Sequence, residues 1–524
     1  MKIILVQTPW SESSYKEFKG ISKKHASYPP LGLMYLAAFV EKNGHSADIL
    51  DLEAAPLSFE EICRKIIRSG AGLIGLTTST PIFHLVRAYA SAFKRKLNLP
   101  IVVGGSHITV LKDKTFTKEF DFAVMNEGEY TLVELMNELE KNKNYAKISG
   151  LIYRQGDRVK VNPPRPFIEN LDSIPFPDRH KIDIRKYIFE VPGKGRIPVA
   201  TTELARGCPF NCVFCSEPLN TGKKLRARST ENAVREMLEV RKEFNISHFF
   251  MLDSTLTANR KLIEDFCHKL IEKKTDITFE GSTRANLVDE SLLNLMKKAG
   301  LVRLAFGLES SNKKVLSLMK KQVDPDSIRE AFRLCKKLNI SALCGVMMGN
   351  PGDTRETILE TARFVRSIPG IRYAPMAIAT PYPGTELFYM AKNGMHGLKL
   401  LESDYGKYSR YAGGVMEIDG MKPAELIRLQ RKAMIIMHST PSKIIGLIRH
   451  YGFFTLLSMT LTMIKNELII GFGGGEPVLR AIETENTTLK NLGLIPGDNS
   501  GNNDCPKPAP YARDKTPQEA PPPV

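Results

Sequence analysis

Three cysteines with the spacing C-x3-C-x2-C are the part of this sequence best suited to chemistry. Cys208, Cys212 and Cys215 stand in the segment RGCPFNCVFC. Three thiolates this close can hold three corners of an iron–sulfur cluster from one loop, whereas electron-transfer clusters usually have four thiolate ligands. A zinc site would need a fourth Cys or His nearby, and the next His along the chain is His248. The spacing therefore predicts a [4Fe–4S] cluster with one iron open to a substrate or cofactor.

This segment resembles the cysteine loop of the radical S-adenosylmethionine (SAM) superfamily. The resemblance covers roughly residues 195–390, and RGCPFNCVFC is similar to the subgroup that has a cobalamin-binding N-terminal domain. It implies that the amino nitrogen and carboxylate of SAM bind the open iron, and that electron injection then releases a 5′-deoxyadenosyl radical. It also implies an electron donor such as a flavodoxin or a ferredoxin.

Further candidates for SAM contact lie mostly at the ends of successive predicted strands. Arg284 is expected to pair with the methionine carboxylate as a bidentate fork, and Glu309 to hold ribose hydroxyls. Gly349 belongs to a turn where small residues would let the backbone approach the adenine. Each of these residues has an alternative role as a cap or a simple turn. The full set of candidates is Phe214, Asp253, Arg284, Gly307, Glu309, Gly349 and Pro351.

A series of alternating strands and helices must position these residues. Six apolar runs are expected to be strands, and amphipathic helical segments lie between them. Six repeats are short of the eight of a closed barrel, so the sequence predicts a partial (βα)6 TIM-type barrel over residues 195–390. The cysteine loop follows the first strand, at the end where barrel chemistry occurs. The expected strands are 197–204, 246–252, 277–282, 302–308, 341–348 and 374–380.

The first 143 residues show a second α/β pattern. Five strand-like runs separated by amphipathic segments predict a doubly wound, flavodoxin-like parallel sheet, whose ligand should sit at the carboxyl ends of its strands. The G-x-G-x-x-G fingerprint is missing after the first strand, which argues against a dinucleotide. The region instead resembles the cobalamin-binding domains of the same subgroup. The expected strands are 2–8, 45–52, 71–79, 100–106 and 122–128.

The cobalamin candidates are small, hydroxyl-bearing and acidic residues at these strand ends. The D-x-H-x-x-G pattern of methionine-synthase-type domains is not present; aligned on Gly32, Pro29 stands at its histidine position, so no lower axial His is assigned. His25 is expected to be a surface residue, and His107 to be structural or to touch the corrin. The alternative is a degenerate domain that binds nothing. The candidates are Pro30, Gly32, Thr77, Ser79, Gly104, Gly105, Ser106, His107, Glu127, Gly128 and Glu129.

The rest of the chain divides by composition. Residues 144–194 are a Pro-rich connector with a short hairpin-like piece, and residues 391–495 are expected to form a helical C-terminal domain over the barrel mouth. The segment 496–524 is rich in Pro, Asn and Asp, which predicts a disordered tail.

The charge and the apolar segments bear on partners and location. The net charge is +17, but the Lys and Arg are spread along helices and no aromatic–basic platform is present, so nucleic acid is not expected. The start has no export signal and the eight cysteines do not form a disulfide framework, which favours the cytoplasm. No run reaches 18 apolar residues. The stretch 443–472, with Lys443, Arg449 and Lys465, is either a peripheral membrane contact or a buried helix.

The two implied cofactors favour C-methylation of an unactivated carbon in a small-molecule or lipid substrate. Oxidative cyclisation or rearrangement, as in relatives of the anaerobic porphyrin-ring cyclase, needs the same equipment and stays open. A cluster or corrinoid sensor without turnover is the alternative from another class. Methylthiolation is disfavoured, because enzymes of that type carry three further N-terminal cluster cysteines and here only Cys63 precedes Cys208.

Overall fold

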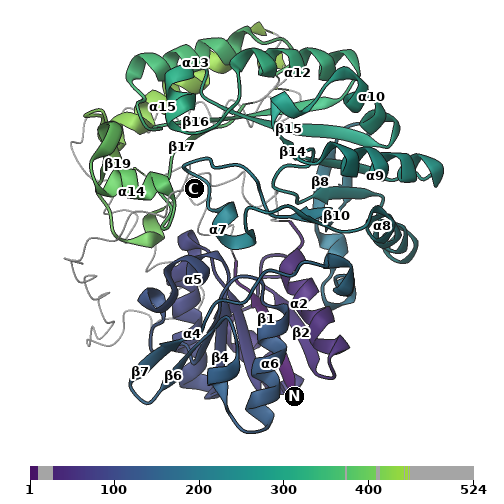
Figure 1. The fold of residues 1–524 in the computed structure, drawn as a ribbon, viewed down its shortest axis with the longest axis vertical. Coiled ribbons are helices and arrows are strands. Elements are labelled where there is room, and N and C mark those ends of the chain that lie inside the picture. Colours follow the sequence, from purple (N-terminus) through teal and green to yellow (C-terminus); the bar gives the residue numbers. More distant parts are fainter. Residues whose placement is uncertain (10–27, 372–373, 409–413, 442, 446–447, 449–524) are drawn as a thin grey trace.

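The computed structural model describes residues 1–9, 28–371, 374–408, 414–441, 443–445 and 448. Two α/β units lie one against the other, the N-terminal unit below and the barrel unit above, with the short helix α7 (Glu217–Thr221) between them (Figure 1). The predictions for His25, Arg449, Lys465, most of 443–472 and the tail 496–524 lie outside the described residues.

The N-terminal unit is a doubly wound sheet with the strand order β2-β1-β3-β4-β5, which is the flavodoxin-like order. These five strands are parallel. Helices α3 and α4 contribute to the apolar core on one face, and α2 and α6 to the core on the other. Its strands are β1 (Lys2–Gln7), β2 (Ser46–Asp51), β3 (Leu73–Thr77), β4 (Ile101–Gly104) and β5 (Phe122–Val124). Its helices are α2 (Leu31–Lys42), α3 (Phe59–Ser69), α4 (Phe83–Leu97), α5 (Ser106–Leu111) and α6 (Glu129–Glu140).

The hairpin assigned to the connector belongs to this first sheet. Strands β6 (Leu151–Gln155) and β7 (Arg158–Val161) continue it beyond β5 in the antiparallel sense. The predicted boundary at residue 143 is therefore wrong. The physical reason is that β5 would otherwise be an open edge, and an unpaired edge strand accepts a neighbouring hairpin.

The second unit is the predicted partial barrel. Its six strands are parallel and lie in the order β10-β13-β14-β15-β16-β17. Their bounds are β10 (Ala200–Thr202), β13 (His248–Met251), β14 (Thr278–Thr283), β15 (Leu301–Glu309), β16 (Ser341–Met348) and β17 (Met376–Ile378). The main helices of the series are α8 (Thr230–Phe244), α9 (Arg260–Glu272), α10 (Glu290–Lys298), α11 (Lys313–Leu318), α12 (Pro325–Lys337) and α13 (Arg355–Ser367).

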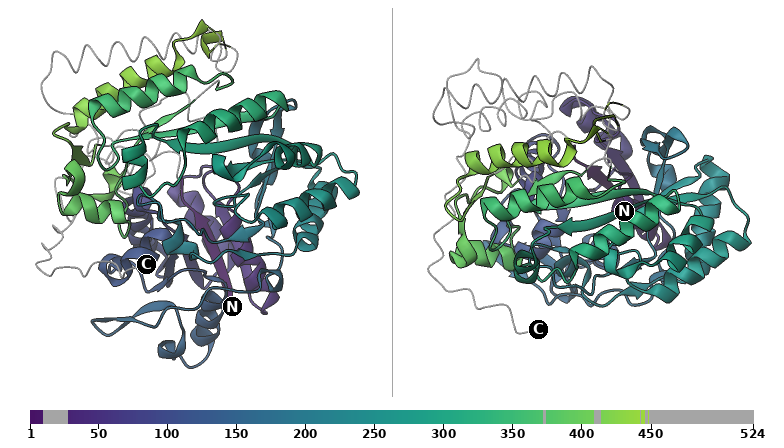
Figure 2. Two further views of the ribbon diagram at one scale, coloured as in Figure 1. Left: turned by 45° about the horizontal axis from the view of Figure 1, so that its top comes forward. Right: turned by 90° about the horizontal axis from the view of Figure 1, so that it is seen from above.

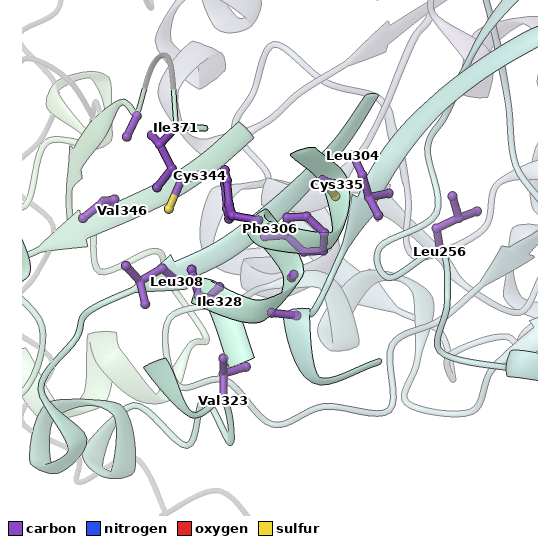
Figure 3. Close-up of a cluster of buried hydrophobic side chains, with 14 of the residues drawn as sticks. Leu256, Leu304, Phe306, Leu308, Val323, Ile328, Cys335, Cys344, Val346 and Ile371 are labelled. Atoms are coloured by element: carbon purple, nitrogen blue, oxygen red, sulfur yellow. The ribbon is translucent and has the colours of Figure 1, made fainter. Parts of the chain in front are cut away.

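Side chains alternate along the barrel strands as a half-buried sheet requires. Leu304, Phe306 and Leu308 of β15 are fully buried and pack with Ile328 and Cys335 of α12 (Figure 3). The intervening residues of β15 are only half-buried. The hydrophobic core therefore lies against the outer face of the sheet, and side chains on the inner face remain partly exposed.

The first predicted barrel strand, 197–204, is divided in two. Its beginning belongs to β9 (Gly195–Pro198), which pairs with β8 (Ile188–Val191) in a separate hairpin, and only β10 enters the barrel sheet. Pro198 has no backbone N–H and favours such a break. The guanidinium of Arg303 donates to the carbonyl of Glu190 at 2.8 Å, so this hairpin lies against the inner side of β15, near its start.

The described C-terminal region has no core of its own. It contains α14 (Glu386–Lys392), the antiparallel pair β18 (Leu398–Leu400) and β19 (Met416–Ile418), and α15 (Pro423–His438). Apolar side chains of β18, β19 and α15 join the core of the barrel, and α15 packs along α13 (Figure 2). The prediction of a separate helical domain is therefore wrong for this part of the chain.

Lys443 is buried and does not face a membrane. Its Nζ donates to the carbonyls of Val365, Arg366 and Met437 at 2.7, 3.1 and 3.2 Å. A cation is favourable at the carboxyl ends of helices such as α13 and α15. Of the two alternatives predicted for the stretch 443–472, Lys443 therefore fits the buried one. No helix among the described residues is long and apolar enough to span a bilayer.

Candidate active site

The three cysteines lie on one closed lobe, residues 207–225, which we call the cysteine lobe. Strands β11 (Ala205–Arg206) and β12 (Arg226–Ala227) pair antiparallel and form its stem. Gly207 has φ +102°, and a Cβ there would lie 2.2 Å from the carbonyl oxygen of Lys224. Only glycine fits the point where the chain enters the lobe.

Backbone hydrogen bonds fix the chain at two of the three cysteines. The Cys208 N–H donates to the Gly222 carbonyl at 3.1 Å, and the Cys215 N–H to the Cys212 carbonyl at 3.0 Å. Burial raises the pKa of the Cys215 thiol to about 12, and the other two cysteines add to the rise. Coordination to a metal deprotonates a thiol outright, so bound iron would offset this cost.

The donor set fits a cluster better than a single ion. Among the described residues, no three Cys, His, Asp or Glu side chains converge on one ion. Three iron corners spread their thiolates more widely than one tetrahedral zinc does. Three thiolates on one lobe are a donor set whose chemistry fits such a cluster.

Arg284, which is predicted to pair with the methionine carboxylate, lies beside the cysteine lobe. Its Nη1 donates to the Sγ of Cys212 at 3.6 Å, and its Cζ lies 3.9 Å from the centroid of the Phe210 ring. Its Nη2 donates to the carbonyl of Lys321. In the part of the chain that the structure describes, its Nε has no hydrogen-bond partner. The buried guanidinium thus places a positive charge next to one cluster cysteine.

Glu309 and Gly307 meet a cation that the sequence did not single out. The Nζ of Lys321 lies 2.9 Å from Oε1 of Glu309, and 5.8 Å from the centroid of the Phe214 ring. A Cβ at Gly307 would lie 2.8 Å from the same Nζ. The KKQ run around Lys321 looks like an ordinary surface stretch, but this lysine is buried. Its burial beside Glu309 and Phe214 results from tertiary packing, which the local sequence does not indicate.

Asp253 holds the chain that leads into the lobe. Its carboxylate accepts the backbone N–H of Leu204 at 3.0 Å and that of Ala205 at 2.8 Å. Burial raises its pKa to about 7. These contacts indicate a positioning role, and the contact with SAM stays a prediction.

The predicted adenine-side loop lies against the C-terminal region. Gly349 follows β16, and a Cβ there would lie 2.5 Å from Cδ1 of Ile418 in β19. The next residues are fixed by Asp353, whose Oδ2 accepts the N–H of Asn350 at 2.9 Å. Pro351 is buried within this turn. The loop is therefore rigid and faces β19.

The carboxyl edge of the N-terminal sheet carries buried polar atoms that lack partners. Within the described chain, no hydrogen bond is made by Oγ1 of Thr8, Oγ of Ser79 or Nε2 of His107. Gly105 has φ +106°, and a Cβ there would lie 2.3 Å from the carbonyl oxygen of Thr78. This edge has the small residues and free polar groups that an amide-rich corrinoid requires. Thr77, Gly104 and Ser106 lie on the same edge, half-buried.

His107 is a buried neutral imidazole in α5. Its Nδ1 lies 3.1 Å from Oγ1 of Thr80, and its ring packs on Phe83 and Tyr405. Burial lowers its pKa to about 3. Tyr405 comes from the C-terminal region, so this histidine joins two parts of the chain that lie far apart in sequence.

The other cobalamin candidates have different surroundings. The carboxylates of Glu127 and Glu129 contact Arg206 on the stem of the cysteine lobe, at 3.1 and 2.8 Å. Gly128 packs on α2, Pro30 caps the start of that helix, and Gly32 is exposed on its first turn. Sequence reasoning found Glu127 and Glu129 but missed their arginine partners.

The two units match two known families. The description "Radical SAM superfamily" fits residues 202–365, and "B12 binding domain" fits residues 21–136. The chain is 33% identical to an uncharacterized methyltransferase of Pyrococcus horikoshii, over 86% of this chain and 96% of that protein. It is 29% identical to the anaerobic magnesium-protoporphyrin IX monomethyl ester cyclase of Rubrivivax gelatinosus, over 76% and 72% of the two chains.

A solved structure shows the same fold. The radical SAM methyltransferase TsrM of Kitasatospora setae, with cobalamin and a [4Fe–4S] cluster bound, superimposes with a TM-score of 0.63. The match covers 82% of this chain and 84% of that one, at 17% identity. The chain therefore belongs to the radical SAM superfamily, in the group whose members also carry a B12-binding domain. It is an enzyme of the cobalamin-dependent radical SAM class, which confirms the predicted resemblance.

Proposed function

We propose that this enzyme transfers a methyl group to an unactivated carbon of a small-molecule or lipid substrate. The observation that carries the proposal is the place of the cysteine lobe, which lies over the carboxyl edge of the N-terminal sheet (Figure 1). Arg206, two residues before Cys208, contacts Glu127 and Glu129 on that edge. A bound cluster supplies the electron that cleaves SAM, and bound cobalamin supplies the methyl group. The relative from Pyrococcus horikoshii, called a methyltransferase, supports this reading.

The chain's own residues hold and orient the reactants. Arg284 and Lys321 bring two cations to the side of the lobe, where they suit the carboxylate of SAM. Asp253 fixes the chain entering the lobe. His107, which is neutral, can offer its free Nε2 to a polar group at the sheet edge.

The test is a single turnover with SAM that carries a deuterated methyl group. The protein is reconstituted under anaerobic conditions with iron, sulfide and hydroxocobalamin, and is then reduced. We expect 5′-deoxyadenosine, S-adenosylhomocysteine and a deuterated methyl group on the protein-bound cobalamin. Protein that forms 5′-deoxyadenosine but neither S-adenosylhomocysteine nor methylated cobalamin would contradict the proposal.

Cyclisation is the second candidate, because a relative is called a cyclase. In that case 5′-deoxyadenosine forms without transfer of the deuterated methyl group, so the same experiment separates the two reactions. The electron donor belongs to the proposal as well. Reduced flavodoxin or ferredoxin is expected to replace dithionite, and no 5′-deoxyadenosine with either protein would exclude that donor type.

Peripheral contact with the cytoplasmic face of a membrane is a finer part of the proposal. Ile435, Ile444 and Ile445 are exposed beside the end of α15, and Arg428 and Lys432 of the same helix are exposed cations. Apolar side chains flanked by cations bind anionic lipid surfaces. The protein is expected to float with anionic vesicles, and a double change Ile444→Ser and Ile445→Ser should weaken flotation. Equal recovery with and without vesicles would exclude lipid contact.

A further inference from the structure

The stem of the cysteine lobe ends in two arginines that face each other. Arg206 and Arg226 are register partners in the β11–β12 pair. All three cluster cysteines lie between them in sequence. Whatever holds this pair of residues therefore sets the position of the whole lobe.

Both arginines converge on one carboxylate of the N-terminal unit. The Nη1 of Arg206 lies 3.1 Å from Oε1 of Glu127, and the Nη1 of Arg226 lies 2.8 Å from the same oxygen. Oε2 of Glu127 accepts the N–H of Ile168 at 2.7 Å. The side chains of Arg206, Arg226 and Glu127 are 10%, 2% and 9% exposed, so solvent screens these contacts little.

Two more carboxylates complete the network. Oε1 of Glu129 lies 2.8 Å from Arg206 Nη1, and Oε1 of Glu203 lies 2.8 Å from Arg206 Nε. Two cations and three carboxylates thus share one buried site. Removing one partner from such a site leaves a buried charge without compensation, so the network specifies one arrangement of the two units.

The lobe has a second contact with the same unit. Helix α7, within the lobe, packs on α5 of the N-terminal unit, and α5 carries His107. Ion pairs therefore hold the stem of the lobe against the N-terminal unit, and helix packing holds its tip there. Both contacts are made with segments that follow β4 and β5, at the carboxyl edge of the sheet.

We propose that Glu127 is a positioning residue that ties both ends of the cysteine lobe to the corrinoid-binding edge, and so fixes the cluster relative to the cobalt. Glu127 belongs to the loop after β5, one of the strand ends expected to bind cobalamin. This inference needs both cofactors but does not need the reaction to be methylation. A shift of about 1 Å in such a placement can reduce a rate a hundredfold.

The test compares Glu127→Gln with Glu169→Gln in the reconstituted holoenzyme. Glu169 pairs with Lys224 of the same lobe at 2.7 Å, but both side chains are mostly exposed, so it is a matched control. Iron and cobalamin contents are measured first. The readout is the spin–spin splitting between the reduced cluster and cob(II)alamin in electron paramagnetic resonance, which depends on their separation and not on turnover.

We expect Glu127→Gln to keep both cofactors but to broaden or shift this splitting, and to raise the ratio of 5′-deoxyadenosine to methylated cobalamin about tenfold. Glu169→Gln should match the wild type. An unchanged splitting in Glu127→Gln overturns the inference, even if methylation is confirmed. If Glu127→Gln does not fold, Glu129→Gln replaces it, since it spares the Arg226 contact. A smaller change in the same direction supports the inference, and a wild-type spectrum overturns it.

Discussion

The two facing edges of this enzyme differ in the groups that they present. At the barrel mouth, charged side chains have partners close to the cysteine lobe, as Arg284 does with Cys212 and Lys321 with Glu309. At the edge of the N-terminal sheet, buried polar atoms of Thr8, Ser79 and His107 lack partners in the described chain. Gly105, which packs closely on the backbone of Thr78, lies at the same edge.

Under the proposed function, this difference matches the ligand that each edge would hold. Thiolate-bound iron and the zwitterionic end of SAM are compact and charged, so they require fixed charges whose own geometry is already set. A corrinoid is large and rich in neutral amides, so it requires space and free hydrogen-bonding groups. The Glu127 network joins the two edges.

The largest expected effect is at the barrel edge. Cys212→Ala should reduce SAM cleavage to background, because two thiolates cannot hold the three corners of the cluster. The measurement is 5′-deoxyadenosine formed by reconstituted, reduced protein. Cys63→Ala is the control, because Cys63 is buried in the N-terminal unit within α3. Appreciable cleavage in Cys212→Ala would contradict the assignment of the cluster.

The sheet edge should respond next most strongly, at Gly105. Gly105→Ala places a Cβ 2.3 Å from the Thr78 oxygen in a conformation that is almost exclusive to glycine. We expect a loss of about 3 kcal/mol in unfolding free energy and at least about tenfold weaker hydroxocobalamin binding. The measurements are denaturant unfolding and spectral titration.

Gly104→Ala is the matched control for Gly105→Ala. Its Cβ would meet only the Val124 oxygen at 3.6 Å, an ordinary contact, so its stability should change by less than about 1 kcal/mol. Equal losses of stability in the two variants would contradict the prediction that the close contact of Gly105 with Thr78 excludes a side chain there.

The sequence predicts the repeating parts of this molecule well. Five of the six barrel strands lie where the sequence places them, since short apolar runs bounded by turn residues are typical of strands. The cysteine loop is found by spacing alone. The comparisons confirm the family, and thus the class of cofactors, that these patterns indicate.

Contacts between distant segments are what the sequence does not reveal. Glu127 and Arg226 are far apart in the chain, and no local periodicity pairs them. Lys321 and Lys443 have the composition of surface residues but are buried by the packing of other elements. The hairpin of β6 and β7 joins the first sheet because of an open edge, which only the assembled sheet possesses.

At the barrel edge, Asp253 should make stability depend on pH. Its folded pKa of about 7 lies above its ordinary value of 3.8, so the folded state binds more protons between these limits. Stability should therefore fall as pH rises from 5 to 8, by about 3 kcal/mol from this group. Asp253→Asn should remove this component in thermal unfolding of cofactor-free protein. The same slope in variant and wild type would contradict the burial of a titrating carboxyl here.

At the sheet edge, His107 should act with the opposite sign. Its folded pKa of about 3 lies below its ordinary value of 6.5, so the unfolded state binds more protons in that window. Stability should fall as pH decreases from 7 to 5, by about 2 kcal/mol from this group. His107→Asn should make the stability depend less on pH below pH 7, and should leave its dependence above pH 7 unchanged. A variant that alters only the alkaline side would contradict the contrast between the two edges.

The smallest expected effect distinguishes two adjacent lysines at the barrel mouth. Lys321→Met removes the cation beside Glu309 and keeps the length of the side chain, so the partly buried carboxylate loses its partner. We expect the KM for SAM to rise about tenfold, with a smaller change in kcat, because the contact orients the bound substrate before any bond breaks. Lys320→Met is the control: Lys320 is half-exposed and pairs with Glu386 at 2.8 Å. If both variants bind SAM equally well, the ion pair of Lys321 with Glu309 stabilises the fold but does not bind SAM. The two edges would then differ in structure without differing in how they bind their ligands.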